Sequence, residues 1–183
     1  MANASPFVQT YMMVKLILPQ ARYLDSYLDF VKEMLANGDM MWTNMPAEDE
    51  SHEDFLRRVL EQATPPKGFV PETQYWGLIG DEVAGRIAIR HHLNDNLKEF
   101  GGHIGYEVKP SFRRQGVAKQ MLKAILALPR AAEIGRLLIT CAPNNIGSNK
   151  TIVACGGILE KTAFVEKWNR DTNYYWIDLH SKK

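Results

Sequence analysis

The spacing of apolar residues along the chain alternates between the period of a helix and the period of a strand. Between residues 21 and 37, apolar side chains recur every three or four positions, which predicts a helix that ends before Gly38. A second helix is expected to begin at Ser51, because Asp54 follows three residues later as in a capping box. The residues between these two helices, 40–49, are expected to form a loop.

Shorter apolar runs bounded by glycine or proline predict strands, and two further helices are expected among them. The expected strands cover 12–18, 73–79, 82–90, 103–108, 136–141, 158–165 and 174–179, and the helices cover 116–128 and 148–154. For the polar connection 93–100 the pattern favours no particular structure. The order β-αα-βββ-α-β-α-ββ predicts a mixed sheet, since a helix crosses between strands. We therefore expect a single α/β (α+β) domain over residues 1–183, with a mixed central sheet of about six to seven strands and helices on both faces.

Composition and charge narrow the classes of function. Apolar residues make up 45% and charged residues 23% of the 183 residues, as in an ordinary globular chain. The 22 basic and 21 acidic residues nearly cancel, so we expect no broad nucleic-acid face, although a local anion site stays open. Neither a membrane-spanning segment nor a signal peptide is evident, and we expect a cytoplasmic protein. Cys141 and Cys155 are expected to be reduced thiols, and the scattered histidines predict no metal site.

The most informative segment is VKPSFRRQGVAKQML, residues 108–122. A strand ends there, and a helix begins directly at Gly116. The first N–H groups of a helix lack partners and carry partial positive charge, so this segment predicts an anion site. Gly116 lets a phosphate approach the backbone, and Arg113 and Arg114 can add charge-assisted hydrogen bonds. The alternative is a basic helix start without a ligand.

Arg113, Gly116 and Ala118 form an Arg-x-x-Gly-x-Ala motif that resembles the pyrophosphate-binding motif of the GNAT family of N-acetyltransferases. A second block resembles the same family, because Asn145 and Ser148 match an Asn-x-x-Ser that opens a short helix. Each has an alternative: Ser148 can cap its helix, and Asn145 can be a turn residue. The resemblance covers most of the chain between residues 74 and 179.

This resemblance implies a GNAT-like acyl-CoA N-acyltransferase fold and acetyl-CoA as cosubstrate, without a metal. Acetyl-CoA would lie in a V-shaped gap between the strands that end at Val108 and Cys141. Its pantetheine arm would pair with the strand edge near Val108, where unpaired backbone groups need partners. Its pyrophosphate would meet the backbone N–H groups of Gln115, Gly116, Val117 and Ala118.

The implied activity is direct transfer of an acetyl group from acetyl-CoA to a primary amine, with much of the rate arising from positioning. A backbone N–H at or near Val108 would polarise the thioester carbonyl. Two departures from the family pattern concern acid and base. Ile152 stands where many members have a Tyr, and Thr140 where some have a Glu. A hydroxyl from another strand, that of Tyr106, Tyr174 or Tyr175, can replace the acid, or the thiolate can leave without one.

Candidates for the base lie on the strand 103–108. Alternation puts His103, Gly105 and Glu107 on one face, where two ionisable side chains and a glycine leave open space. We assign His103 as the candidate general base, since its ordinary pKa is close to operating pH. Glu107 is the second catalytic candidate and can recruit a cationic amine. The alternatives are a structural histidine and an exposed strand carboxylate.

Two other functions stay open. The missing Tyr and Glu also suit a noncatalytic acyl-CoA-binding sensor, and a degenerate loop would suit a structural or partner-binding domain. The expected acceptor is a small-molecule or peptide amine, and we expect no nucleic-acid or membrane partner. A homodimer is an open alternative. An apolar loop with Met40, Met41, Trp42 and Met45 either shapes the acceptor pocket or caps the core.

Overall fold

The computed structural model of the protein describes residues 13–39, 45–61, 65 and 68–180. Its strands are β1 (Lys15–Ile17), β2 (Glu72–Ile79), β3 (Glu82–Arg90), β4 (Ile104–Val108), β5 (Arg136–Cys141), β6 (Ile158–Val165) and β7 (Arg170–Asp178). Its α-helices are α1 (Leu24–Ala36), α2 (His52–Leu60), α3 (Asp95–Glu99), α4 (Val117–Leu126), α5 (Pro129–Ile134) and α6 (Ile146–Ala154). Short 3-10 turns are η1 (Ala21–Tyr23), η2 (Pro110–Phe112) and η3 (Glu166–Trp168). No helix within these described residues is long and apolar enough to cross a membrane.

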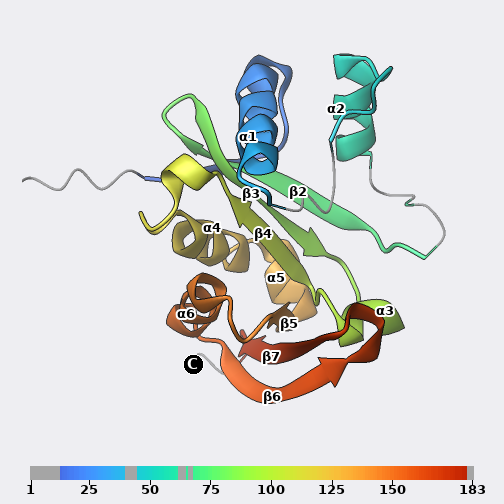
Figure 1. Cartoon of the computed structure of the whole chain (residues 1–183), viewed down its shortest axis with the longest axis vertical. Coiled ribbons are helices and arrows are strands. Elements are labelled where there is room, and N and C mark those ends of the chain that lie inside the picture. Colours follow the sequence, from blue (N-terminus) through green and yellow to red (C-terminus); the bar gives the residue numbers. More distant parts are fainter. Residues whose placement is uncertain (1–12, 40–44, 62–64, 66–67, 181–183) are drawn as a thin grey trace, which may run out of the picture.

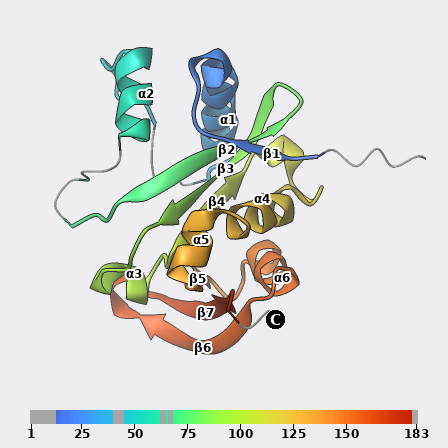
Figure 2. The same ribbon diagram turned by 180° about the vertical axis from the view of Figure 1, so that it is seen from behind.

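The strands form two sheets, one with the order β1-β2-β3-β4 and one with the order β5-β7-β6. Helices α1 and α2 lie on one side of the four-stranded sheet, and α4 and α5 lie on the other (Figure 1). The view from behind agrees and shows α6 beside the second sheet (Figure 2). This confirms an α+β fold with helices on both faces of the sheet.

Apolar clusters hold these layers together. Under α1 and α2, the rings of Tyr27 and Trp76 stack at 4.4 Å between centroids, and both side chains are buried. On the opposite face, the buried apolar side of α4 packs against β3 and β4. Gly85 makes this close approach feasible, because a Cβ there would lie 2.5 Å from the Glu107 carbonyl oxygen and 2.9 Å from Met121. Helix α4, which carries the predicted anion site, is thus fixed against the sheet.

Most of the predicted elements are confirmed, with differences at their ends. The connection 93–100 contains α3, whose first turn is capped by the Asn94 side chain accepting a hydrogen bond from the Leu97 N–H at 2.9 Å. Pro129 begins α5 directly after α4, since proline suits the first position of a helix. Strand β7 begins at Arg170, earlier than expected. Of the apolar loop, Met40, Met41 and Trp42 lie outside the described residues, as does Met12 of the first expected strand.

The expected mixed sheet needs one correction. All pairs within each of the two sheets are antiparallel. Strands β4 and β5, where the order along the chain predicted a parallel step, share no ladder and are joined by an isolated bridge between Gly102 and Ile139. The sheet is therefore split at the place where the sequence predicted a splayed gap.

Candidate active site

The free edge of β4 faces the gap between the two sheets. The Lys109 N–H donates to the Ala84 carbonyl at 2.9 Å, and the Arg90 N–H donates to the His103 carbonyl at 2.8 Å. In an antiparallel ladder, hydrogen-bonded pairs alternate with pairs whose backbone groups point away. The register Gly85 to Val108 therefore turns the Val108 N–H away from β3 and toward the gap. The strand edge thus offers the backbone groups that the sequence assigned to a cofactor arm.

The start of α4 has the shape of an anion site. Gly116 is the residue before the helix and has a φ of 79°, a left-handed conformation that favours glycine. A Cβ built on Gly116 would meet nothing within 4 Å, so the space in front of this helix start is open. The adjacent Arg114 is exposed and makes no ion pair with any described residue. Val117 is buried in the core, which anchors the first turn, whereas Ala118 borders the cleft.

Arg113 and Gln115 have structural partners. The Arg113 guanidinium donates to the Val108 carbonyl at 3.1 Å and to the Asp39 carboxylate at 2.7 Å. The Gln115 amide donates to the Ser111 carbonyl at 2.9 Å. These contacts tie the loop to the strand end and to the end of α1. Arg113 therefore shapes the loop before α4, and Arg114 is the arginine that forms no ion pair with a described residue there.

The start of α6 brings two hydroxyls together. The Asn145 side chain accepts from the Ser148 N–H at 3.0 Å, so Asn145 caps the helix and Ser148 does not. The Ser148 hydroxyl lies 2.8 Å from the Tyr106 hydroxyl of β4, so this pair spans the gap. Both residues line the cleft, whereas Ile152, at the family's Tyr position, is completely buried.

Burial keeps the groups around this hydroxyl pair protonated. The pKa of Tyr106 is raised, chiefly because the phenol is buried, although its hydrogen bond to Ser148 opposes the shift. Burial likewise raises the pKa of the Cys141 thiol, which lies at the end of β5 and borders the same cleft. Thr140, at the family's Glu position, accepts from the Gly101 N–H at 2.8 Å. Tyr106 is thus a neutral hydrogen-bond donor at the gap.

His103 occupies a different position from the one expected of a general base. The ring Nδ1 of His103 accepts from the Leu138 N–H at 2.9 Å, and the backbone N–H of His103 donates to the Leu138 carbonyl at 2.7 Å. Burial, with a smaller contribution from the Arg90 charge, lowers the pKa of His103 to about 4. Its acceptor lone pair is therefore taken up by the backbone of β5, and the geometry supports the structural alternative over proton abstraction.

Glu107 faces the cleft but has a buried partner. Both of its carboxylate oxygens contact the Arg86 guanidinium, one of them at 3.0 Å. Arg86 also donates to the Gln74 side chain at 2.9 Å, and its own side chain is 6% exposed. The expected alternation of the strand is confirmed, since Glu107 points to the cleft and Tyr106 toward α6. The ion pair with Arg86 therefore holds the Glu107 carboxylate in place at the floor of the cleft.

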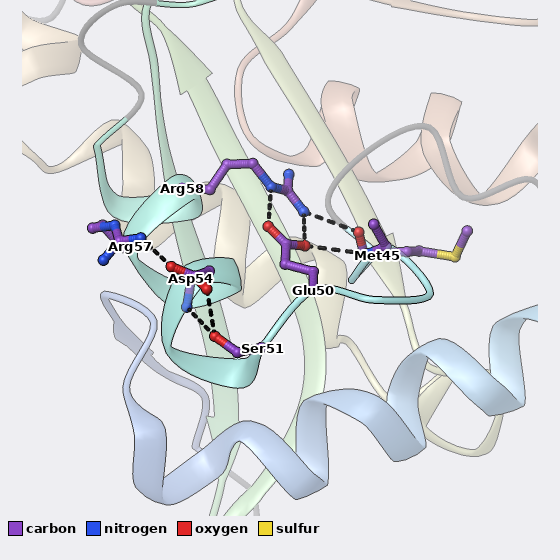
Figure 3. Close-up of polar contacts among 7 residues, drawn as sticks. Met45, Glu50, Ser51, Asp54, Arg57 and Arg58 are labelled. Carbon is purple, nitrogen blue, oxygen red and sulfur yellow. Dashed lines mark hydrogen bonds and ion pairs between the residues drawn. The ribbon is translucent and has the colours of Figure 1, made fainter.

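Two rims bound the outer part of the cleft. On α2, Arg58 donates two hydrogen bonds to Glu50, each 2.7 Å long, and Arg57 pairs with Asp54 (Figure 3). The bonds from Arg58 lower the pKa of the Glu50 carboxyl to about 2. The opposite rim carries Phe100, Lys167, Trp168 and Arg170, which belong to the end of α3 and to the turn between β6 and β7.

The start of α4, the Tyr106–Ser148 pair, Glu107 and both rims line one cleft of about 2060 Å³, whereas His103 and Gln115 do not line it. That volume exceeds the roughly 300–1,000 Å³ of an ordinary small-molecule site, so the cleft has room for two ligands end to end. Among the described residues, no group of three or more His, Cys, Asp or Glu side chains could hold a metal ion.

The sequence did not predict the roles of the two arginines of β3, nor the rim that carries Phe100, Lys167, Trp168 and Arg170. Arg86 lies in the middle of an otherwise apolar strand, which is a recognisable signal for a buried ion pair. Arg90 lies on the same face four residues later and pairs with Glu72 at 3.4 Å. The rim residues carry no such signal, because α3 and the turn before β7 are far apart in the sequence.

Several acetyltransferases of known structure have the same architecture. The microcin C7 self-immunity acetyltransferase MccE, in complex with acetyl-CoA and AMP, has 19% identity and a TM-score of 0.65, with 91% of this chain and 92% of that chain covered. RimL, the ribosomal L7/L12 alpha-N-protein acetyltransferase in complex with coenzyme A, has 20% identity and a TM-score of 0.64, with coverage of 93% and 96%. A putative ribosomal-protein-serine acetyltransferase from Vibrio cholerae has 20% identity and a TM-score of 0.61, with coverage of 91% and 94%. No curated protein sequence matches the chain.

A split sheet with a helix start at its gap defines the acyl-CoA N-acyltransferase class of fold, which the solved structures share. The model of the acetyltransferase (GNAT) domain family matches residues 15–158. The chain belongs to the GNAT acetyltransferase family and is an acetyl-CoA-dependent N-acetyltransferase with acetyl-CoA as its cosubstrate.

Proposed function

We propose that this protein transfers the acetyl group of acetyl-CoA directly to the primary amine of a small molecule or peptide. The observation that carries the proposal is the continuity of the cleft, which runs from the open helix start at Gly116, past the free edge of β4, to Glu107 and the outer rim. One end suits a phosphate-bearing donor, and the other leaves room for an acceptor.

The described residues fit acetyl-CoA at the first end. The unpartnered N–H groups of the first turn of α4 and the unpaired Arg114 suit a pyrophosphate. The gap-facing edge of β4 suits an amide-bearing arm. Acetyl-CoA supplies the activated acyl group, and the Val108 N–H, which points into the gap, is placed to polarise its carbonyl.

On the acceptor side, neither of the two candidate bases is free. His103 is bonded to Leu138, and Glu107 is bonded to Arg86. We therefore assign His103 to linking β4 to β5 beside the gap, and Glu107 to stabilising the floor of the cleft. The amine then reacts from its neutral form, having lost its proton to water, and the chain contributes orientation.

The departing thiolate needs a hydrogen-bond donor, and we assign this role to Tyr106. Its hydroxyl lies at the gap and is held by Ser148 at 2.8 Å. Because the pKa of Tyr106 is raised, the phenol stays protonated and donates a hydrogen bond without having to give up its proton. Tyr106 thus takes the place of the Tyr that Ile152 replaces.

The test combines coenzyme A binding by calorimetry with acetyl transfer followed by mass spectrometry. The acceptor panel contains a free amino acid, a polyamine, an aminoglycoside and a peptide with both a free N-terminus and a lysine. We expect coenzyme A binding and an increase of 42 Da in at least one acceptor, which is roughly the mass of one acetyl group at one nucleophile. Binding without transfer across the panel would contradict the proposal and favour the sensor. An absence of coenzyme A binding would contradict the donor site itself.

The pH dependence of the rate distinguishes acceptors. Because the amine must be neutral, the rate should rise with pH up to the pKa of the amine, about 7.7–8.0 for a peptide N-terminus and about 10.4 for a lysine side chain. A separate inflection in the pH–rate profile near pH 4, the pKa of His103, would contradict the structural assignment of that histidine.

A further inference from the structure

Most arginines that line the cleft are neutralised by an acid. These pairs join Arg86 to Glu107, Arg90 to Glu72, Arg113 to Asp39, Arg58 to Glu50, and Arg57 to Asp54. Among the described residues, the cleft-lining cations without an ion pair fall into two groups. Arg114, Lys119 and Lys150 lie at the phosphate end, where the proposed donor supplies negative charge. Lys167 and Arg170 lie at the other end, where the donor does not reach.

Arg170 is held in place without being neutralised. Its guanidinium lies over the ring of Phe100, 4.4 Å from the centroid. Its Nε is buried and has no hydrogen-bond partner among the described residues. A buried donor without a partner is costly, and Arg170 lines the cleft, so a ligand oxygen that accepted a hydrogen bond from this guanidinium would offset part of that cost.

Lys167 and an aromatic pair complete this end of the cleft. The Lys167 ammonium donates to the Asn96 side chain at 3.2 Å and forms no ion pair within the described part of the chain. The rings of Phe100 and Trp168 lie 5.0 Å apart. Both views show α3 beside the turn between β6 and β7, which is where these residues meet (Figures 1 and 2). Phe100 fixes the plane of the guanidinium that it stacks against.

The acids closest in sequence leave these two cations free. Glu99, Glu166 and Asp171 are neighbours of the rim, and none of them forms an ion pair with Lys167 or Arg170. Among the described residues, Glu61 and Glu99 also line the cleft without an ion pair, so unpaired charges of both signs lie along it, and Lys167 and Arg170 are the unpaired cations of the rim that Phe100 and Trp168 form. Two unpaired cations on one rim of a cleft attract and orient an ion of the opposite sign.

We propose that the acceptor amine carries an anionic group, a carboxylate or a phosphate, which binds Arg170 with the help of Lys167. This inference rests on the proposed function and specifies its substrate class. A planar guanidinium that forms no ion pair with a described residue suits an anion with two oxygens, and Lys167 adds a second charge. With its anion held at the outer rim, the amine is directed inward, past Glu107 toward the gap.

The test compares acceptors that differ in one charge. The first arm uses peptides with a free N-terminus and Asp or Glu at the second or third position, each paired with its Asn or Gln analogue. The second arm uses an aminoalkyl phosphate and the corresponding amino alcohol. We expect kcat/KM to be about 10- to 100-fold higher for the anionic member of at least one arm, as for one or two hydrogen bonds to a charged group. The arm in which the difference occurs tells carboxylate from phosphate.

Arg170→Gln should abolish this preference while leaving coenzyme A affinity within a few-fold of wild type. The matched control is Arg136→Gln. The Arg136 guanidinium also lies over an aromatic ring, that of Trp176 at 4.2 Å, but outside the cleft. It should retain the full preference. Arg170→Glu should invert the preference toward peptides with Lys at the same positions.

The outcomes separate this inference from the proposed function. Acetyl transfer with equal kcat/KM for both members of every pair would overturn the inference and leave the proposed function intact. A preference that survives Arg170→Gln would also overturn it, because the anion would then bind elsewhere. Coenzyme A binding without transfer to any acceptor would overturn the proposed function, and this inference with it.

Discussion

The two ends of the cleft differ in whether backbone groups or side chains line them. The phosphate end is mostly backbone: an open helix start at Gly116 and a free strand edge at Val108, both within one continuous segment. The acceptor end is made of side chains from separate elements, held by buried pairs such as Arg86 with Glu107. A backbone site has the same chemistry whatever the acceptor. The side-chain end can change its specificity without disturbing the binding of the donor.

The strongest way to break this comparison is to place a charge at the backbone end. Gly116→Asp puts a carboxylate beside the pyrophosphate and requires a left-handed backbone at residue 116. Coenzyme A affinity measured by calorimetry should fall roughly 1,000-fold, as expected for like charges about 4 Å apart near a protein surface. Gly116→Asn is the matched control, since asparagine tolerates the same backbone and adds no charge. Equal affinities for the Asp and Asn variants would refute a charge-sensitive site at this helix start.

A change at the acceptor end should instead affect stability. Glu107→Gln leaves the Arg86 charge buried without a carboxylate and should lower the free energy of unfolding by roughly 3 kcal/mol in urea titration. The control is Glu133→Gln, in a pair with Arg130 whose side chains are 46% and 59% exposed, where less than about 1 kcal/mol is expected. Similar losses in the two variants would mean that the pair does not hold the floor of the cleft.

Between the two ends of the cleft, His103 links the start of β4 to β5. His103→Leu removes the acceptor for the Leu138 N–H and should lower the free energy of unfolding by about 2 kcal/mol. His103→Asn keeps an acceptor near the Nδ1 position and should lose less. In both variants, the folded protein should retain acetyl transfer within a few-fold of wild type. A loss of rate on the order of 100-fold in the folded Asn variant would restore His103 as a base.

The pH dependence of stability sharpens the same point. The pKa of His103 is lowered to about 4 in the folded state, against 6.5 ordinarily, so the unfolded chain binds more protons between these values. The stabilisation from a neutral His103 is complete above pH 6.5 and is lost as the pH falls. From pH 6.5 to 5, wild type should lose about 1.5 kcal/mol more than His103→Asn. Parallel curves for the two proteins would contradict a buried neutral imidazole.

The smallest expected effect concerns the hydroxyl at the gap. Tyr106→Phe removes one hydrogen bond to the departing thiolate and should lower kcat about tenfold, with coenzyme A affinity unchanged. Tyr175→Phe is a control, since its hydroxyl bonds to Asn149 at 2.6 Å and Tyr175 does not line the cleft. If the Tyr175 variant lost as much as the Tyr106 variant, the effect would be one of packing alone.

The difference between the two ends also explains what the sequence could predict. The features of the phosphate end all lie within one continuous segment, from Val108 to Ala118. A strand end, a glycine and a helix start in that segment were therefore enough to predict the site. The alternation of β4 was also predictable. The Leu138 N–H that binds the His103 ring was not, because it comes from a strand 35 residues away. For the same reason, the rim of Phe100, Lys167 and Arg170 appears only when α3 and the turn before β7 meet in space.

The most direct test of the account is backbone amide hydrogen exchange with and without coenzyme A, read by NMR at single residues. The two-ended cleft predicts that coenzyme A slows exchange at the start of α4, residues 115–119, and at the gap-facing amides of Tyr106 and Val108. The amides of residues 167–170 should stay unchanged. Protection centred on α2 or on residues 167–170, with none at Gly116 or Val108, would contradict the assignment of the donor to the backbone end.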